Sequence, residues 1–213
     1  MQDSAVTVLA TTQKLSTDLG EASYHSVEFK GLLPETLYAY RVGDGANWSE
    51  WFQFRTASRQ RKSFSFIYFG DAQREVKSQW SRVIRQAYKH ASDARFVIHA
   101  GDLIDRHNRD AQWGEWFNAG GWLNGMLPSI PAVGNHEYGS DESGTRHLST
   151  HWRPQFTLPM HGPEGLEETA YYVDYQGVRI VVLNTNEQLE KQVAWLDGVL
   201  ADNFTSMLDA AMD

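Results

Sequence analysis

Three stretches of this chain share one design: an apolar run, then a glycine, then a side chain with an oxygen donor. They span residues 64–71, 97–102 and 130–135. An apolar run that ends abruptly is typical of a buried parallel strand, whose last residue lies at the edge of a sheet. Ligand sites of open α/β sheets form at the carboxyl ends of the strands. We therefore expect Asp71, Asp102 and Asn135 to converge, and their oxygen donors make a metal site plausible.

The segments between and after these runs predict a layered α/β domain. In 74–90 the apolar residues recur at helical spacing and form one face. A strand is expected at 95–100, an aromatic-rich helix follows it until Gly125, and strands are expected at 170–175 and 178–184. A last helix is predicted over 186–201, and 138–169 is expected to be irregular. Strands that alternate with helices indicate two or more packed layers.

The first 58 residues predict a small all-β domain. Alternating side chains and turn residues favour antiparallel strands at 25–29, 36–42 and 48–56. The polar and basic residues of 58–63 are typical of a linker. We therefore expect two units, 1–58 and 63–213, and no chemistry in the first of them.

Composition excludes some functions and leaves others open. The net charge of −8, with no basic stripe, argues against nucleic-acid binding. The absence of cysteine excludes disulfides and zinc-thiolate sites. No apolar run approaches the ~18 residues of a membrane span. The first residues lack the features of a signal peptide, which leaves localisation open, and nothing predicts the oligomeric state.

Each oxygen donor also has a purely structural interpretation. Asp71 is in a position to cap a helix N-terminus, and Asp102 with Asp105 suits a turn that carries capping carboxylates. Asn135 suits a left-handed turn after Gly134. The three together, at matched strand ends, favour the shared site.

The motifs resemble those of the calcineurin-like metallophosphoesterases, and more closely the purple acid phosphatases with an N-terminal fibronectin type III-like domain. Gly134-Asn135-His136-Glu137 and Gly101-Asp102 are the most specific, and 69–73 is similar to the first motif of the family. Residues 32–38 resemble the tyrosine corner of fibronectin type III domains. The resemblance implies an α+β or α/β fold of the four-layer type, a β-sandwich flanked by helices, here incomplete and preceded by a partial fibronectin-like domain.

This resemblance implies a hydrolase that acts on a phosphate ester through two divalent or trivalent metal ions, Fe, Mn or Zn. Asp71 would bind the first metal, Asp102 would bridge both, and Asn135 would bind the second. His136 would hold or protonate the leaving-group oxygen. Two adjacent cations stabilise the attacking and leaving oxygens of an in-line displacement, and an imidazolium protonates a departing alkoxide.

Two departures from the family pattern carry consequences. Asp105 stands where purple acid phosphatases have the tyrosine that binds ferric iron, so no purple colour is expected, and Arg106 beside it is a candidate phosphate contact. Only three or four of the seven strands of a fibronectin type III domain are visible, and the C-terminal histidine motifs of the family are missing, so we expect a chain truncated at both ends. The alternative function is therefore a catalytically incompetent relative that acts as a weak metal-binding or interaction module.

The remaining histidines offer few substitutes for the missing ligands. His99 lies inside a strand and is expected to pack in the core. His107 follows the central motif and is a candidate for reaching the site. For His147, His151 and His161, hydrogen bonding on the surface or within the irregular segment is favoured over a role in the site.

Overall fold

A three-stranded parallel sheet carries the candidate site. The computed structural model describes residues 5–212, with side chains described as far as residue 201. The sheet has the order β5 (Ile67–Phe69), β6 (Val97–Ala100), β7 (Ser129–Ala132). Phe69 pairs with His99, and His99 with Pro131, so the three strands end side by side. The sheet therefore places the residues that follow each strand at one edge.

Helices cover one face of this sheet because their apolar sides and the strands form one core. A single π-helical turn, η1 (Val76–Trp80), leads into α1 (Ser81–His90), so the helix expected at 74–90 is divided into two parts. The crossover from β6 to β7 contains α2 (Asp110–Gly120) and α3 (Trp122–Met126). Trp80 and Trp116 stack at 5.6 Å between ring centroids, within a cluster that includes Ile67 and Val97 of the sheet.

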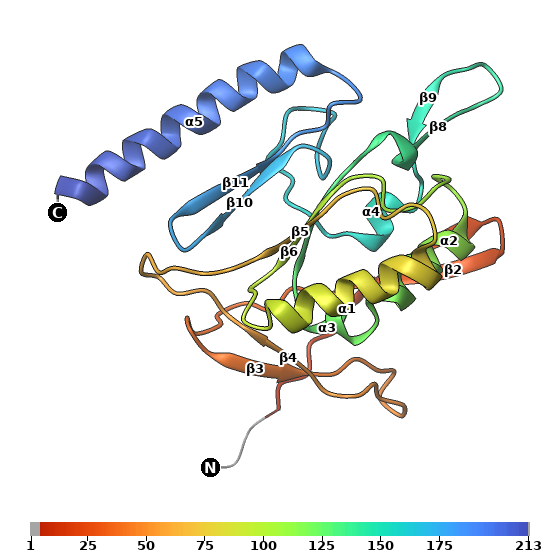
Figure 1. Cartoon of the computed structure of the whole chain (residues 1–213), viewed down its shortest axis with the longest axis horizontal. Coiled ribbons are helices and arrows are strands. Elements are labelled where there is room, and N and C mark those ends of the chain that lie inside the picture. Colours follow the sequence, from red (N-terminus) through yellow and green to blue (C-terminus); the bar gives the residue numbers. More distant parts are fainter. Residues whose placement is uncertain (1–4, 213) are drawn as a thin grey trace.

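The opposite face packs against a second sheet and then a helix. The hairpin of β10 (Tyr171–Tyr175) and β11 (Val178–Val182) buries Tyr171 and Val182 against Phe96 and Ile130. The last helix, α5 (Leu189–Met212), lies along this hairpin (Figure 1) and continues past the expected end at residue 201. The order helix, sheet, sheet, helix confirms the expected mixed, layered fold class.

The N-terminal part consists of two antiparallel hairpins. Strand β1 (Thr11–Thr17) pairs with β2 (Gly20–Ser26), and β3 (Leu37–Tyr40) pairs with β4 (Phe52–Arg55). The expected strand 25–29 was placed too late, since β2 ends at Ser26, and β1 was not predicted. The tyrosine corner is confirmed, because the Tyr38 hydroxyl accepts a hydrogen bond from the Leu33 N–H at 2.9 Å.

The segment expected to be irregular contains short elements of its own. A hairpin of β8 (Tyr138–Ser140) and β9 (Arg146–Leu148) extends from the body, and α4 (Trp152–Gln155) packs into the core through Trp152. In the part of the chain that the structure describes, no helix combines the length and apolarity needed to cross a membrane.

Candidate functional site

Two aspartates at the ends of neighbouring strands adopt the same unusual backbone conformation. Asp71 follows β5 with φ 51°, and Asp102 follows β6 with φ 52°. The left-handed region is unfavourable for residues other than glycine, by about 1–3 kcal/mol when it is held in a folded structure. Such conformations gather at functional sites, where the surrounding structure enforces them. The matched conformation of these two residues therefore marks this edge of the sheet as a candidate site.

Two glycines let the loops after β6 and β7 touch. A Cβ atom on Gly101 would lie 2.7 Å from the Gly134 Cα, and one on Gly134 would lie 2.1 Å from Asp102 Oδ1. Both distances are shorter than real carbon contacts, so any larger residue would force the loops apart. Gly101 also has φ +87°, which favours glycine. The glycines of both motifs thus serve the close approach of Asp102 to the turn that follows β7.

Glu137 fastens these two loops together from within. Its side chain is fully buried, and its carboxylate accepts backbone N–H groups from Asp102 at 2.9 Å, Leu103 at 2.8 Å and Gly134 at 2.7 Å. Burial raises the pKa of Glu137, while these three donors favour the ionised form. The carboxylate therefore acts as a clamp that holds Asp102 in its left-handed conformation.

His136 lies in the 3₁₀ turn η2 (Asn135–Glu137) and is oriented by two contacts. Its backbone N–H donates to Asp102 Oδ1 at 2.9 Å, and its Nδ1 lies 2.7 Å from the Asp105 carbonyl oxygen. A carbonyl oxygen only accepts, so Nδ1 carries the proton. Within the described residues Nε2 has no hydrogen-bond partner, so it is free to interact with a ligand.

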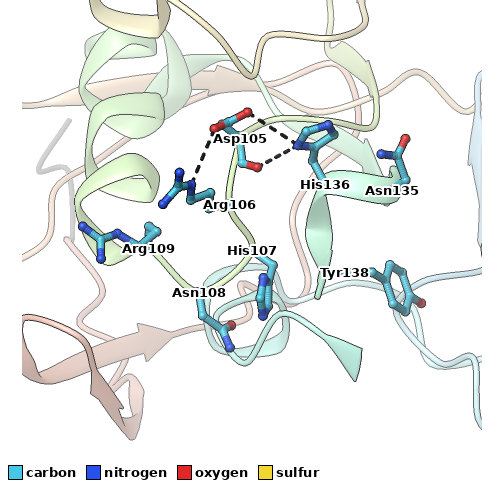
Figure 2. A pocket seen from close by; sticks show the side chains of 8 residues that line it. All are labelled: Asp105, Arg106, His107, Asn108, Arg109, Asn135, His136 and Tyr138. Atoms are coloured by element: carbon cyan, nitrogen blue, oxygen red, sulfur yellow. Dashed lines mark hydrogen bonds and ion pairs between the residues drawn. The ribbon is translucent and has the colours of Figure 1, made fainter. Parts of the chain in front are cut away.

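These loops line a pocket of about 440 Å³. Figure 2 shows Arg106 and Arg109 on one side of it, with Asn135 and His136 on the other. The complete lining is Asp105, Arg106, His107, Asn108, Arg109, Asn135, His136 and Tyr138. Arginine, histidine and asparagine side chains are suited to bind an anion with several oxygen atoms.

The structure brings the sequence-predicted residues together to different degrees. Asp102 and His136 are in direct contact, and Asn135 precedes His136 in the same turn. Asp71 follows the neighbouring strand β5, and its side chain forms no hydrogen bond within the described residues. It caps no helix, because Glu75 precedes η1. Asn135 does not have a positive φ, so the expected left-handed turn was wrong; of the three oxygen donors, Asp71 and Asp102 have a positive φ.

The other histidines mostly follow the expectations. His99 is 1% exposed and packs among Phe69, Trp80 and Trp116, and burial lowers its pKa to about 4. His107 lines the pocket, and burial and then the charge of His151 lower its pKa.

The histidines of the later segment form local contacts. His147 pairs with Asp141 at 2.8 Å, and His161 accepts the Tyr172 N–H at 3.3 Å. His151 is buried, and its Nε2 lies 3.1 Å from Asp110 Oδ1. These three histidines form hydrogen bonds within or beneath the loops, as favoured.

Some pocket residues were not predicted from the sequence. Tyr138 is held by a hydrogen bond to Glu187 at 2.5 Å and by one from Asn184 at 2.7 Å, and burial raises its pKa. Arg109 forms an ion pair with Asp18 at 3.3 Å. Position next to the Asp102 motif was the only available signal for Arg109, and nothing local pointed to the distant Asp18.

The donor set suits a hard cation but is made of oxygens alone. Among the described side chains, those of residues 5–201, no group of three or more histidine, cysteine, aspartate or glutamate residues is arranged to hold a metal ion. A site here would need Asp71, Asp102 and the amide oxygen of Asn135 together. Carboxylate and carbonyl oxygens suit Mg²⁺, Ca²⁺ and Mn²⁺, so the residues fit a metal by their chemistry.

Comparison with known protein families identifies the class of protein to which this fold belongs. The family model of the calcineurin-like phosphoesterases matches residues 64–203, more than half of the chain, so the chain belongs to that family. The model described as the purple acid phosphatase N-terminal domain matches residues 2–56.

Two relatives give this assignment more detail. Acid phosphatase type 7 of Danio rerio is 30% identical over 139 residues, which cover 63% of this chain and 29% of that protein. The solved purple acid phosphatase PPD1 from yellow lupin (Lupinus luteus) seeds matches with a TM-score of 0.68 at 19% identity. That match covers 90% of this chain and 40% of the lupin chain, and it shows a shared fold. The chain thus spans well under half the length of both relatives.

Proposed function

We propose that this protein hydrolyses phosphate esters at the edge of the β5–β7 sheet, with a dinuclear metal centre. The observation that carries the proposal is the enforced approach of Asp102 to the turn of Asn135 and His136, beside a pocket with two arginines. Membership of the calcineurin-like phosphoesterase family supports the same reaction class.

Three residues would hold the metals. Asp71 would bind one ion, Asn135 the other, and Asp102 would lie between them. Two metal ions supply Lewis acidity and a water that ionises near neutral pH. An oxygen-only donor set favours Mn over Fe or Zn. Asp105 stands where the purple enzymes carry tyrosine, and its carboxylate lies near Arg74 Nε at 3.7 Å and Arg106 Nε at 3.9 Å.

The chain's own groups perform the remaining steps. Arg106 holds the phosphoryl oxygens from the side of the pocket opposite His136. His136 acts here as an imidazolium: Nδ1–H stays on the Asp105 carbonyl, and Nε2–H passes its proton to the leaving-group oxygen, which leaves the neutral ring. Glu137 keeps Asp102 in place throughout, because its three hydrogen bonds are to backbone that does not need to move.

The test measures metal content and turnover on the same protein. Purified chain is loaded with Mn²⁺, Fe²⁺ or Zn²⁺, desalted, and examined by elemental mass spectrometry and by hydrolysis of p-nitrophenyl phosphate. We expect bound metal and turnover in the wild type, and loss of both in Asp102→Asn. Asp197→Asn is the matched control, because Asp197 is an exposed aspartate of α5. Absence of metal and turnover with all three ions would refute the proposal and leave the non-catalytic alternative.

A further inference from the structure

The tip of the N-terminal β1–β2 hairpin reaches the start of α2. The two strands are joined by a two-residue turn, and Asp18 lies in this turn. Asp18 Oδ1 accepts the Asp110 N–H at 2.9 Å, and Asp18 Oδ2 lies 3.3 Å from Arg109 Nε. The Tyr24 hydroxyl adds a 3.4 Å hydrogen bond to Asp110 Oδ1. One carboxylate of the hairpin thus both caps α2 and holds an arginine of the pocket.

This contact leaves Arg109 able to bind a ligand. Its side chain is 56% exposed, and the closest contact of the ion pair is through Nε. Within the described residues the two terminal amino groups of its guanidinium have no hydrogen-bond partner. The guanidinium is planar, so these terminal groups present parallel N–H donors in a geometry that matches a carboxylate or phosphate.

The place of Arg109 in the pocket indicates what it contacts. Arg106 and Arg109 lie across the pocket from Asn135 and His136, and the Arg109 guanidinium extends outward, away from His136 (Figure 2). In the proposed reaction His136 protonates the leaving-group oxygen, so the leaving group extends from His136 into the rest of the pocket. Arg106 lies near Asp105 and is assigned above to the phosphoryl group. Arg109 is therefore the cation left for the leaving group itself.

We infer that Arg109, held at the pocket by Asp18 of the β1–β2 hairpin, recognises a second anionic oxygen group on the substrate. The preferred substrates are phosphate esters whose leaving group carries a carboxylate or another phosphate. The N-terminal hairpin then contributes to specificity, with Arg109 as the specificity-determining residue and Asp18 as a positioning residue. This inference rests on the proposed function for the orientation of the substrate.

The experiment separates anion recognition from catalysis. Benzylphosphonate, 4-carboxybenzylphosphonate and 4-phosphonobenzylphosphonate are titrated into Mn²⁺-loaded protein by calorimetry, because phosphonates are not hydrolysed. The wild type should bind at least one of the two doubly substituted compounds about 10-fold more tightly than benzylphosphonate, since one hydrogen bond to a charged group has about that value. Which compound is preferred distinguishes carboxylate-bearing from phosphate-bearing substrates.

Variants then show which residue causes the preference for the doubly substituted phosphonates. Arg109→Gln should reduce it to less than twofold and leave benzylphosphonate binding unchanged. Asp18→Asn should reduce it about threefold in the wild type and have no effect in Arg109→Gln. Lys14→Gln removes one positive charge from the same hairpin, where Lys14 pairs with Glu21, and should change nothing.

Four results decide the matter. Equal binding of all three compounds, no binding of any, or a preference that persists in Arg109→Gln overturns the inference. A preference lost in Arg109→Gln but present in Lys14→Gln supports it. If that preference accompanies no hydrolysis of p-nitrophenyl phosphate, the proposed function fails while the anion site stands.

Discussion

Replacement of Glu137 by glutamine tests whether a buried carboxylate holds the two loops of the site together. Its carboxylate accepts N–H groups from Asp102, Leu103 and Gly134, which come from loops after two different strands. In the best orientation the glutamine oxygen keeps the two bonds of Oε2, to Asp102 and Gly134. Its NH₂ group then faces the Leu103 N–H, and two donors oppose each other.

The expected loss of stability follows from the hydrogen bonds that the glutamine keeps and loses. One hydrogen bond to a charged acceptor, worth about 1.5–3 kcal/mol, is lost and leaves a buried donor unsatisfied. The two retained bonds weaken because the acceptor becomes neutral. Relief of the buried charge offsets part of this loss, since desolvation raises the pKa of Glu137. We expect Glu137→Gln to lower the free energy of unfolding by about 2 kcal/mol, roughly a 30-fold change in the folding equilibrium.

Urea denaturation of the metal-free protein at pH 7 measures this value, with Glu115→Gln as the matched control. Glu115 is exposed on α2, so the same chemical change there should fall within about 0.5 kcal/mol of the wild type. Metal titration supplies a second readout, because loosening of Asp102 should weaken metal binding in Glu137→Gln and not in Glu115→Gln. Equal stability and equal metal affinity in the two variants would refute the clamp.

Three further predictions concern residues beside the site and in the core. Gly134→Ala should abolish metal binding and lower the free energy of unfolding by about 2 kcal/mol or more, because overpacking has that cost. The control is Gly114→Ala in α2, where no atom lies within 4 Å of the added methyl group; it should raise the free energy of unfolding by about 0.5–1 kcal/mol in thermal unfolding. Burial lowers the pKa of His99 to about 4, so the stability that its neutral ring contributes is complete above pH 6.5 and is lost as the pH falls towards 4. Between pH 7 and pH 5, the free energies of urea unfolding of the wild type and His99→Phe should therefore diverge by about 2 kcal/mol. An equal pH dependence in the two proteins would contradict burial of an unprotonated ring. Tyr38→Phe removes the bond to the Leu33 N–H and should cost about 1 kcal/mol in urea unfolding, and no loss would show that water replaces the hydroxyl.

Local sequence patterns were sufficient to locate the strand ends that build the site. The apolar runs before Asp71, Asp102 and Asn135 are parallel strands of one sheet, and their register places these residues at one edge. The tyrosine corner could also be predicted from the sequence, because Tyr38 and Leu33 are only five residues apart. Such features depend on the spacing of side chains along one segment, which the amino-acid sequence states directly. The roles of the donors in binding metal stay predictions.

Strands without an apolar face could not be recognised in this way. In β1 the side chains are mostly polar and mostly exposed, so no alternation marks Thr11–Thr17 as a strand. It exists because all seven of its residues pair with β2. The helix expected at 74–90 does have the predicted apolar face, but the spacing of its apolar residues did not reveal that its first turn is π-helical.

The amino-acid sequence by itself determined the three strands that precede the site, the mixed layered fold class and the residue types available at the edge of the sheet. Tertiary structure alone decided that Glu137 reaches back to Asp102, and that Asp18 reaches forward across 92 positions to the start of α2. It also decided that, of the three oxygen donors, Asp71 and Asp102 adopt a left-handed conformation and Asn135 does not. The physical reason is that strand and helix periodicity is a property of neighbouring residues. A buried carboxylate and an ion pair between distant segments exist only after packing has brought their partners together.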